Sequence, residues 1–209
     1  MSSAPAGEPD VGVLVAQATV PDLEVFDAPD AATPTRTLDN PTEVGGPLVF
    51  LVDEERDEWL QVLLPVRPNG STGWIRRADV ELRRNPYSIV VELASHQITV
   101  RRGEEVIAQE PIGVGTGDTP TPGGRYYLKE LLRPPDPNGA YGPYAYGLSG
   151  FSEVLTAFAS GEGVIGIHGT NDPSSIGRDV SHGCIRLHND AITALAEFLP
   201  LGTPVDIQA

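Results

Sequence analysis

The sequence predicts a mostly β protein in two parts, with little helix in either part. Its 209 residues include 23 glycines and 20 prolines, which favour short strands joined by turns over long helices. Apolar residues make up 40% of the chain, enough to form buried cores. Because a usual domain holds roughly 100–150 residues, this length is comfortable for two domains.

The first part, residues 11–84, follows a stretch at 1–10 whose small residues, Pro and Gly predict a flexible tether. Short β-prone runs predict strands at 11–16, 23–26, 48–52 and 59–64. The last two runs flank an acidic stretch and predict a hairpin, and Asn69-Gly70 marks another tight turn.

The order of aromatic and turn residues in this part resembles bacterial SH3-like domains. Trp59 is followed by the Asn69-Gly70 turn, then by Gly73-Trp74-Ile75 and Asp79-Val80. The resemblance covers residues 11–82 and implies an SH3-like small barrel that binds cell-wall material or braces the second part. We expect both tryptophans to pack in the barrel core and rim, so the first part is assigned no catalytic residue.

The second part, residues 86–209, begins after the polar, Pro-containing stretch Arg83-Arg84-Asn85-Pro86. Further strands are expected at 88–93, 97–101, 106–110, 112–114, 126–131, 164–167 and 204–207. Residues 134–146, rich in Pro, Gly and Tyr, are too long for a tight turn and predict a lid over a site. Asn189-Asp190 is expected to cap a short helix over 191–198.

Charge and hydropathy exclude several function classes. A formal charge of −15 argues against binding nucleic acid or an anionic membrane surface, since both need a basic patch. The chain contains no run of 18 apolar residues, so no membrane span is predicted. The first residues lack the apolar core of a signal peptide. Membrane anchoring would therefore need a segment upstream of Met1. A single cysteine forbids an internal disulfide.

Candidate chemistry is concentrated in Ile167-His168-Gly169-Thr170 and in residues 181–189, which together hold the single cysteine and three of the four histidines. A free thiol with a pKa of about 8.5 is mostly protonated at neutral pH, so a reactive cysteine needs a base or cation beside it. His182 and His168 are the candidates for Cys184. If residues 182–188 are extended, alternate side chains share one face with the sulfur.

Two other interpretations of these residues stay open. Cys184 could be a buried small hydrophobe, the usual role of a lone cysteine, although its polar, turn-forming flanks favour a reactive thiol. Zinc could bind His168, His182, Cys184 and His188, but the paired spacing of structural zinc sites is missing, and we expect no metal and no cofactor. The fourth histidine, His96, lies in a predicted turn and is expected to be exposed.

The motifs of the second part resemble those of the L,D-transpeptidases, the YkuD-type domain that cross-links bacterial peptidoglycan. His168-Gly169-Thr170 precedes Ser181-His182-Gly183-Cys184-Ile185-Arg186 in the family's order, and residues 171–178 resemble its connecting loop. Residues 114–124 resemble its glycine-rich segment and residues 202–205 its final strand. The resemblance covers residues 86–209 and implies a β-rich catalytic fold with a short helix. Some members carry Asn where this chain has Arg186.

The resemblance implies acyl transfer through a thioester on Cys184, with His168 as the base, held by the carbonyl of Gly169. Backbone N–H groups around His182, Gly183 and Cys184 would hold the oxyanion. His182 and Arg186 would position the substrate. The implied substrate-binding residues are Arg186, Ser181, Thr170, Tyr144 and Tyr146.

The implied partners are peptidoglycan stem peptides, with carbapenem β-lactams as covalent inhibitors, and the implied location is outside the cytoplasm. A cysteine peptidase or carboxypeptidase would use the same residues with water as the acceptor. A non-catalytic wall-binding protein is a third possibility, but a binding role does not require a nucleophile.

Overall fold

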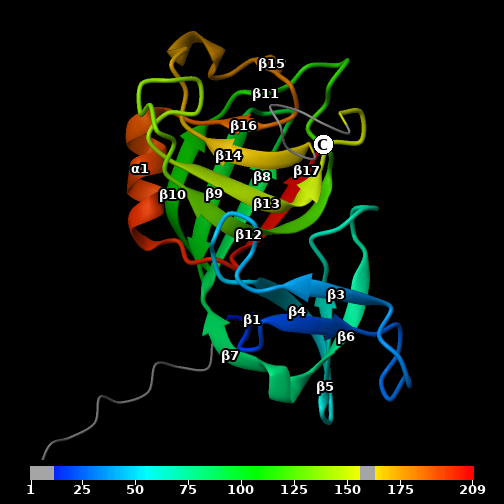
Figure 1. The fold of residues 1–209 in the computed structure, drawn as a ribbon. Coiled ribbons are helices and arrows are strands. Elements are labelled where there is room, and N and C mark those ends of the chain that lie inside the picture. The colour runs from blue at the N-terminus through cyan, green and yellow to red at the C-terminus, as the bar shows by residue number, and fades with distance from the viewer. Residues whose placement is uncertain (1–11, 156–162) are drawn as a thin grey trace, which may run out of the picture.

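The computed structural model describes residues 12–155 and 163–209, which form two lobes (Figure 1). The described residues are mostly strand, with one short α-helix, as the composition predicted. The tether expected at 1–10 falls outside them. No helix in the described ranges is long and apolar enough to cross a membrane.

The N-terminal lobe, residues 12–85, is built on an antiparallel sheet in the order β6-β5-β4-β1-β7. Its strands are β1 (Val13–Ala18), β4 (Val49–Arg56), β5 (Trp59–Leu63), β6 (Thr72–Arg76) and β7 (Val80–Asn85), with a 3-10 turn at Arg77–Asp79. The predicted hairpin between residues 48 and 64 is confirmed. Its turn is shorter than expected, because β4 continues through the acidic residues to Arg56.

A second hairpin, β2 (Asp22–Val25) and β3 (Arg36–Asp39), packs across this sheet. Phe26 and Trp74 exchange backbone hydrogen bonds of 2.8 Å, which join the end of β2 to β6. Trp74 is buried, and the Trp59 ring meets the Phe26 ring edge-on at 5.0 Å. Both tryptophans therefore pack as expected, while the resemblance to SH3-like domains stays a prediction.

The C-terminal lobe, from residue 86 onwards, contains a sheet in the order β10-β9-β8-β17-β12-β13-β14-β16. Its strands are β8 (Tyr87–Glu92), β9 (Gln97–Arg102), β10 (Glu105–Pro111), β12 (Gly124–Leu132), β13 (Ala145–Phe151), β14 (Val164–His168), β16 (Ile185–Arg186) and β17 (Pro204–Gln208). Strands β11 (Val114–Gly115) and β15 (Asp179–Ser181) form a separate parallel pair. Helix α1 (Asn189–Phe198) buries Ile192 and Leu195 in the core of this lobe.

The two lobes share buried structure instead of being joined by a polar linker. Strand β7 runs to Asn85 and β8 begins at Tyr87, so the expected junction is itself strand. The buried Asn85 amide donates to the Thr203 hydroxyl at 3.0 Å. Tyr127 of β12 lies in one hydrophobic cluster with residues of the N-terminal lobe, namely Val15, Val49, Leu51 and Leu63.

A second contact joins the loop between β5 and β6 to the end of β13. The Asn69 side chain donates to the carbonyl of Phe151 at 2.8 Å and accepts from its N–H at 2.9 Å. Arg67 donates to the carbonyl of Ser152 at 2.8 Å. These paired bonds, together with the buried cluster, hold the lobes in one relative position.

Candidate active site

His168 and Cys184 are brought together by two neighbouring strands. His168 ends β14, and Cys184 directly precedes β16, which pairs with β14 in parallel. A Cβ atom placed on Gly166 would stand 3.8 Å from the His168 Cδ2 atom and 3.9 Å from the Cys184 sulfur. The same Cβ atom would lie 3.1 Å from the Tyr146 carbonyl oxygen, so glycine at this position leaves room beside both the imidazole and the thiol.

The His168 imidazole is held in one orientation and in its neutral form. It is 5% exposed, and its Nδ1 atom lies 2.6 Å from the carbonyl oxygen of Gly169, as the resemblance implied. Burial lowers the pKa of His168 to about 4. The Gly169 hydrogen bond raises this pKa but does not offset the burial, and the charge of Arg186 lowers it further. The ring is therefore neutral at pH 7.

The Cys184 thiol is protonated at neutral pH in the free protein. Burial raises its pKa above the ordinary thiol value, while a backbone hydrogen bond from Gly166 and the positive charge of Arg186 lower it in part. If the sulfur acts as a nucleophile, it must lose its proton during attack, and a neutral imidazole beside it can accept that proton.

The residues before Cys184 form a turn, so the expected extended face over 182–188 is wrong. Gly183 has a φ of 111°, which favours glycine. Its N–H donates to the Ser181 hydroxyl at 3.1 Å, and that hydroxyl donates to the Cys184 carbonyl at 2.5 Å. Ser181 is buried and fixes the turn through these bonds, while its expected contact with a substrate stays a prediction.

A side-chain contact from α1 holds the loop after His168. The Thr170 N–H donates to Asn189 Oδ1 at 2.8 Å, and the buried Thr170 hydroxyl accepts from the Asp172 N–H at 3.1 Å. Thr170 is therefore part of the loop structure, and its expected substrate role stays a prediction. The predicted helix cap is also wrong, because His188 is the N-cap residue and the Asn189 side chain faces the loop.

The expected lid covers the imidazole through Tyr141. Its ring centroid lies 4.8 Å from that of His168, and the rings are tilted by 59°. Burial and the neighbouring Cys184 raise the pKa of Tyr141. A Cβ on Gly142, which has a φ of 62°, would stand 2.4 Å from Asn189 Oδ1 and 2.6 Å from the Gly169 Cα atom. Only glycine allows the lid to approach the base so closely.

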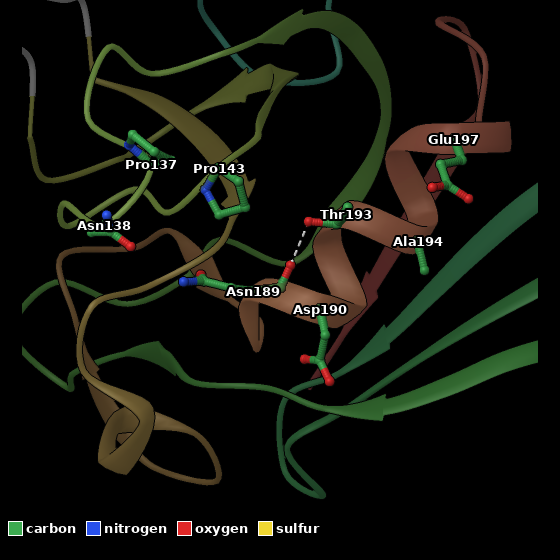
Figure 2. A pocket seen from close by; sticks show the side chains of 8 residues that line it. All are labelled: Pro137, Asn138, Pro143, Asn189, Asp190, Thr193, Ala194 and Glu197. Carbon is green, nitrogen blue, oxygen red and sulfur yellow. Dashed lines mark hydrogen bonds between the residues drawn. The ribbon is translucent and has the colours of Figure 1, made fainter.

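The opposite side of the lid faces α1 across a hollow of about 520 Å³ (Figure 2). In this view the Asn189 side chain points toward the lid, while its carbonyl accepts the Thr193 hydroxyl at 2.6 Å. The lining residues are Pro137, Asn138, Pro143, Asn189, Asp190, Thr193, Ala194 and Glu197.

The two tyrosines expected to bind substrate have other contacts. Tyr146 is buried, and its hydroxyl donates to the Leu199 carbonyl at 2.9 Å, so the phenol group belongs to the core. Tyr144 is half-buried, and its carbonyl accepts from the Gly169 N–H at 3.2 Å. Tyr141 and Tyr146 both line the cavity beside His168, and the ring next to the imidazole is that of Tyr141, whose place in the predicted lid segment was its only sequence signal.

His168 and Cys184 open into a cavity of about 870 Å³ that lies between the lobes. The C-terminal lobe contributes Gly166, Tyr141 and residues of β12 and β13 to its lining. The N-terminal lobe contributes residues from the loop between β3 and β4, and from 65–66. The sequence did not predict that the N-terminal lobe forms one wall of this cavity.

The remaining candidates, Arg186, His182 and His96, differ in burial and in their contacts. Arg186 is half-buried, and its Nε atom is buried with no hydrogen-bond partner among the described residues. His182 is exposed, and neither His182 nor Arg186 is part of the cavity lining. His96 is paired with Asp179 at 2.7 Å and is only partly exposed, contrary to expectation.

The four residues considered as zinc ligands do not form a metal site. Among residues 12–155 and 163–209, no group of three or more His, Cys, Asp and Glu side chains is placed to hold a metal ion. The zinc interpretation therefore has no ligand cluster to support it in this part of the chain.

A model of the L,D-transpeptidase catalytic domain, YkuD, matches residues 86–207. The candidate L,D-transpeptidase YkuD of Bacillus subtilis is 38% identical over 122 residues, which are 58% of this chain and 66% of that protein. YqjB of the same organism, also named as a candidate L,D-transpeptidase, is 30% identical over 131 residues, or 58% of this chain and 70% of its own. The chain thus spans just under two thirds of the length of YkuD.

Among solved structures, L,D-transpeptidase 3 of Mycobacterium tuberculosis, in complex with a faropenem-derived adduct, has a similar fold. The TM-score is 0.53 at 17% sequence identity, and the match covers 95% of this chain and 93% of that one. The similarity therefore extends over both lobes.

Proposed function

The chain belongs to the L,D-transpeptidase catalytic domain family through residues 86–207, and we propose that it transfers acyl groups between peptidoglycan stem peptides through a thioester on Cys184. The carrying observation is that this thiol and the neutral, carbonyl-bound imidazole of His168 flank the open position at Gly166, within one cavity. A nucleophile beside an oriented base is the arrangement that acyl transfer requires.

In the first half-reaction, the Cys184 sulfur attacks the carbonyl carbon before the terminal D-alanine of a stem tetrapeptide. The His168 Nε2 atom takes the thiol proton as the carbon–sulfur bond forms, then gives it to the departing amine as the carbon–nitrogen bond breaks. D-Alanine leaves and an acyl thioester remains on Cys184.

The oxyanion needs backbone donors near the sulfur. The Gly183 N–H already donates to Ser181, so it is not a free donor. We assign the main role to the Cys184 N–H. The Ser181 hydroxyl fixes the position of this N–H, because it binds the Gly183 N–H on one side and the Cys184 carbonyl on the other.

In the second half-reaction, an amine of a neighbouring stem attacks the thioester. His168 accepts the amine proton and returns it to the sulfur, which restores the thiol as the new amide forms. If water takes the place of the amine, the same residues act as a carboxypeptidase. This substrate places the working protein outside the cytoplasm, where peptidoglycan is assembled.

Carbapenem β-lactams present a strained amide carbonyl to the same sulfur. We expect ring opening to leave a stable thioester, because a site that passes its acyl group to an amine offers water poorly. One adduct per chain should map to the peptide containing Cys184 and should be absent from the Cys184→Ala variant.

Mass spectrometry of products from a purified stem tetrapeptide, with and without an acceptor amine, tests the proposed reaction. We expect loss of D-alanine and formation of the acceptor adduct with the wild-type chain, and neither product with Cys184→Ala. Release of the tripeptide alone, even at saturating acceptor amine, would identify a carboxypeptidase. A turnover that survives in Cys184→Ala would reject the thioester mechanism.

A further inference from the structure

The cavity that holds the thiol is completed by the N-terminal lobe. The loop between β3 and β4, residues 40–48, extends toward β12 of the C-terminal lobe (Figure 1). The cavity is lined by Leu38 of β3, by Val44 near the tip of this loop and by Leu48 at its end. A volume of about 870 Å³ lies within the range of roughly 300–1,000 Å³ that is usual for a pocket that binds a small ligand.

Exposed apolar side chains line both walls of this cavity. Val44 at the tip of the loop is 51% exposed, and on the opposite wall Leu132 and Tyr141 are each 38% exposed. Apolar groups left in water beside a nucleophile gain from burial when a ligand enters, by roughly 25 cal/mol per Å² of apolar surface. They therefore favour a ligand that touches both lobes.

The two walls also differ in charge. Asp39 and Glu43 lie on the N-terminal wall, while Lys129, Glu130 and Arg133 lie on the C-terminal wall, which therefore holds two positive charges and one negative charge. Lys129 is 3.7 Å from Glu130, and the Arg133 guanidinium lies over the Tyr144 ring, so neither is paired with the opposite wall. A ligand that carries both a carboxylate and an ammonium group suits this arrangement, and a stem peptide carries both.

The loop is held in place before any ligand binds. The Asn40 side chain donates to the carbonyls of Ala18 and Val20, at 3.2 and 3.0 Å, and accepts from the Leu48 N–H at 3.1 Å. At the tip, the Thr42 N–H donates to the Gly46 carbonyl at 2.9 Å. A wall that is already ordered costs little conformational entropy on binding.

We infer that residues 38–48 form a substrate-binding wall, and that Val44 determines affinity for the stem peptide while taking no part in the chemistry. This inference rests on the proposed function and deepens it. It gives the N-terminal lobe a direct role at the site, beyond the bracing or wall-binding roles expected from the sequence.

Val44→Asp tests the inference, with Val44→Ser as a milder variant and Val106→Asp as the matched control. Val106 of β10 is a similarly exposed valine, at 46%, but it does not line the cavity. Two rates are compared for each full-length chain: kcat/KM for a stem tetrapeptide, and the rate of Cys184 acylation by a small carbapenem. The carbapenem reports on the thiol and base without needing the distant wall.

For Val44→Asp we expect kcat/KM for the peptide to fall roughly tenfold, mainly through KM, with a smaller fall for Val44→Ser. Carbapenem acylation should stay within about twofold for both, as should both rates of Val106→Asp. Unchanged peptide kinetics in both Val44 variants, or an equal loss with the carbapenem, would overturn the inference. A wild-type chain that forms the adduct but leaves the peptide intact would instead reject the proposed function, and the inference with it.

Discussion

The Nδ1 atom of His168 lies 2.6 Å from the carbonyl oxygen of Gly169, the next residue along the chain. A carbonyl only accepts hydrogen bonds, so Nδ1 carries the proton and Nε2 keeps its lone pair. A carboxylate in the same place would stabilise the charged imidazolium much more strongly. With a carbonyl partner in a buried setting, the ring stays neutral over most of the pH range.

The first prediction concerns the pH dependence of acylation. Because burial lowers the pKa of His168 to about 4, we expect the base to be active well below neutral pH. The rate of Cys184 acylation by a carbapenem should therefore fall with a midpoint near pH 4 as the imidazole is protonated. Rates measured from neutral to acidic pH would check this, and a midpoint near the ordinary histidine value would contradict it.

The second prediction concerns stability. An unfolded chain protonates His168 near 6.5 and the folded chain only near 4, so between these values the unfolded chain binds more protons. The contribution of His168 to the free energy of unfolding is thus complete above the unfolded pKa and is lost as pH falls through this window. The total is on the order of 3 kcal/mol.

Urea unfolding at several pH values measures this effect when the wild type is compared with His168→Gln, which cannot titrate. The carboxyl groups are common to both chains, so their effects cancel in the difference. The variant should lose less stability than the wild type as the pH is lowered. If the stabilities of the two chains changed in parallel with pH, the pKa of His168 would not be lowered in the folded chain as described.

Much of the C-terminal fold was predictable because its strands are local β-prone runs bounded by turn residues. The runs expected at 97–101, 164–167 and 204–207 are found within a residue or so as β9, β14 and β17. Strand β13 was not predicted. Its sequence mixes glycine with aromatic residues, and it is strand because β12 and β14 pair with it on both sides.

The site was predictable where the chemistry is carried by rare residue types in a fixed order, as with His168 and Cys184. It was not predictable where a side chain serves a tertiary contact. Asn189 carried the sequence signal of a helix cap, yet its side-chain oxygen accepts a hydrogen bond from the Thr170 N–H in the loop after β14. The N-terminal wall depends on how two lobes pack, which no local pattern records.

The third prediction concerns Asn189. Asn189→Ala removes the acceptor of the buried Thr170 N–H, and an unsatisfied buried donor costs roughly 1–3 kcal/mol. The loop carrying the Gly169 carbonyl would loosen, so we expect slower acylation as well as lower stability. Asn189→Asp keeps an acceptor oxygen and should restore most of both. Equal damage by Ala and Asp, measured by carbapenem acylation and thermal melting, would contradict this assignment.

The fourth prediction concerns the lid glycine. Gly142→Ala places a methyl group 2.6 Å from the Gly169 Cα atom, so the lid must move away from His168. Gly103→Ala is the matched control, since Gly103 has a similar φ of 60° but nothing lies within 4 Å of the added Cβ. Backbone strain is thus common to both, at roughly 1 kcal/mol. Thermal melting and acylation should both suffer more in Gly142→Ala, and equal effects would show that the close approach is unimportant.

The last prediction concerns Arg186, whose buried Nε atom has no hydrogen-bond partner in the described ranges. A buried donor without a partner lowers stability, so Arg186→Met should unfold at the same or a higher urea concentration than the wild type. Its positive charge nevertheless lowers the pKa of Cys184, so the variant should be alkylated by iodoacetamide only at higher pH.

The family resemblance, and not the cavity lining, assigns Arg186 a substrate-positioning role. On that assignment the same variant should lose roughly 10–100-fold in kcat/KM for a stem peptide. Arg178→Met, a change at an exposed arginine in the preceding loop, is the control and should alter neither property. Together, unchanged stability and lost activity would identify Arg186 as a substrate contact. A variant that is both less stable and fully active would show that Arg186 supports the fold instead.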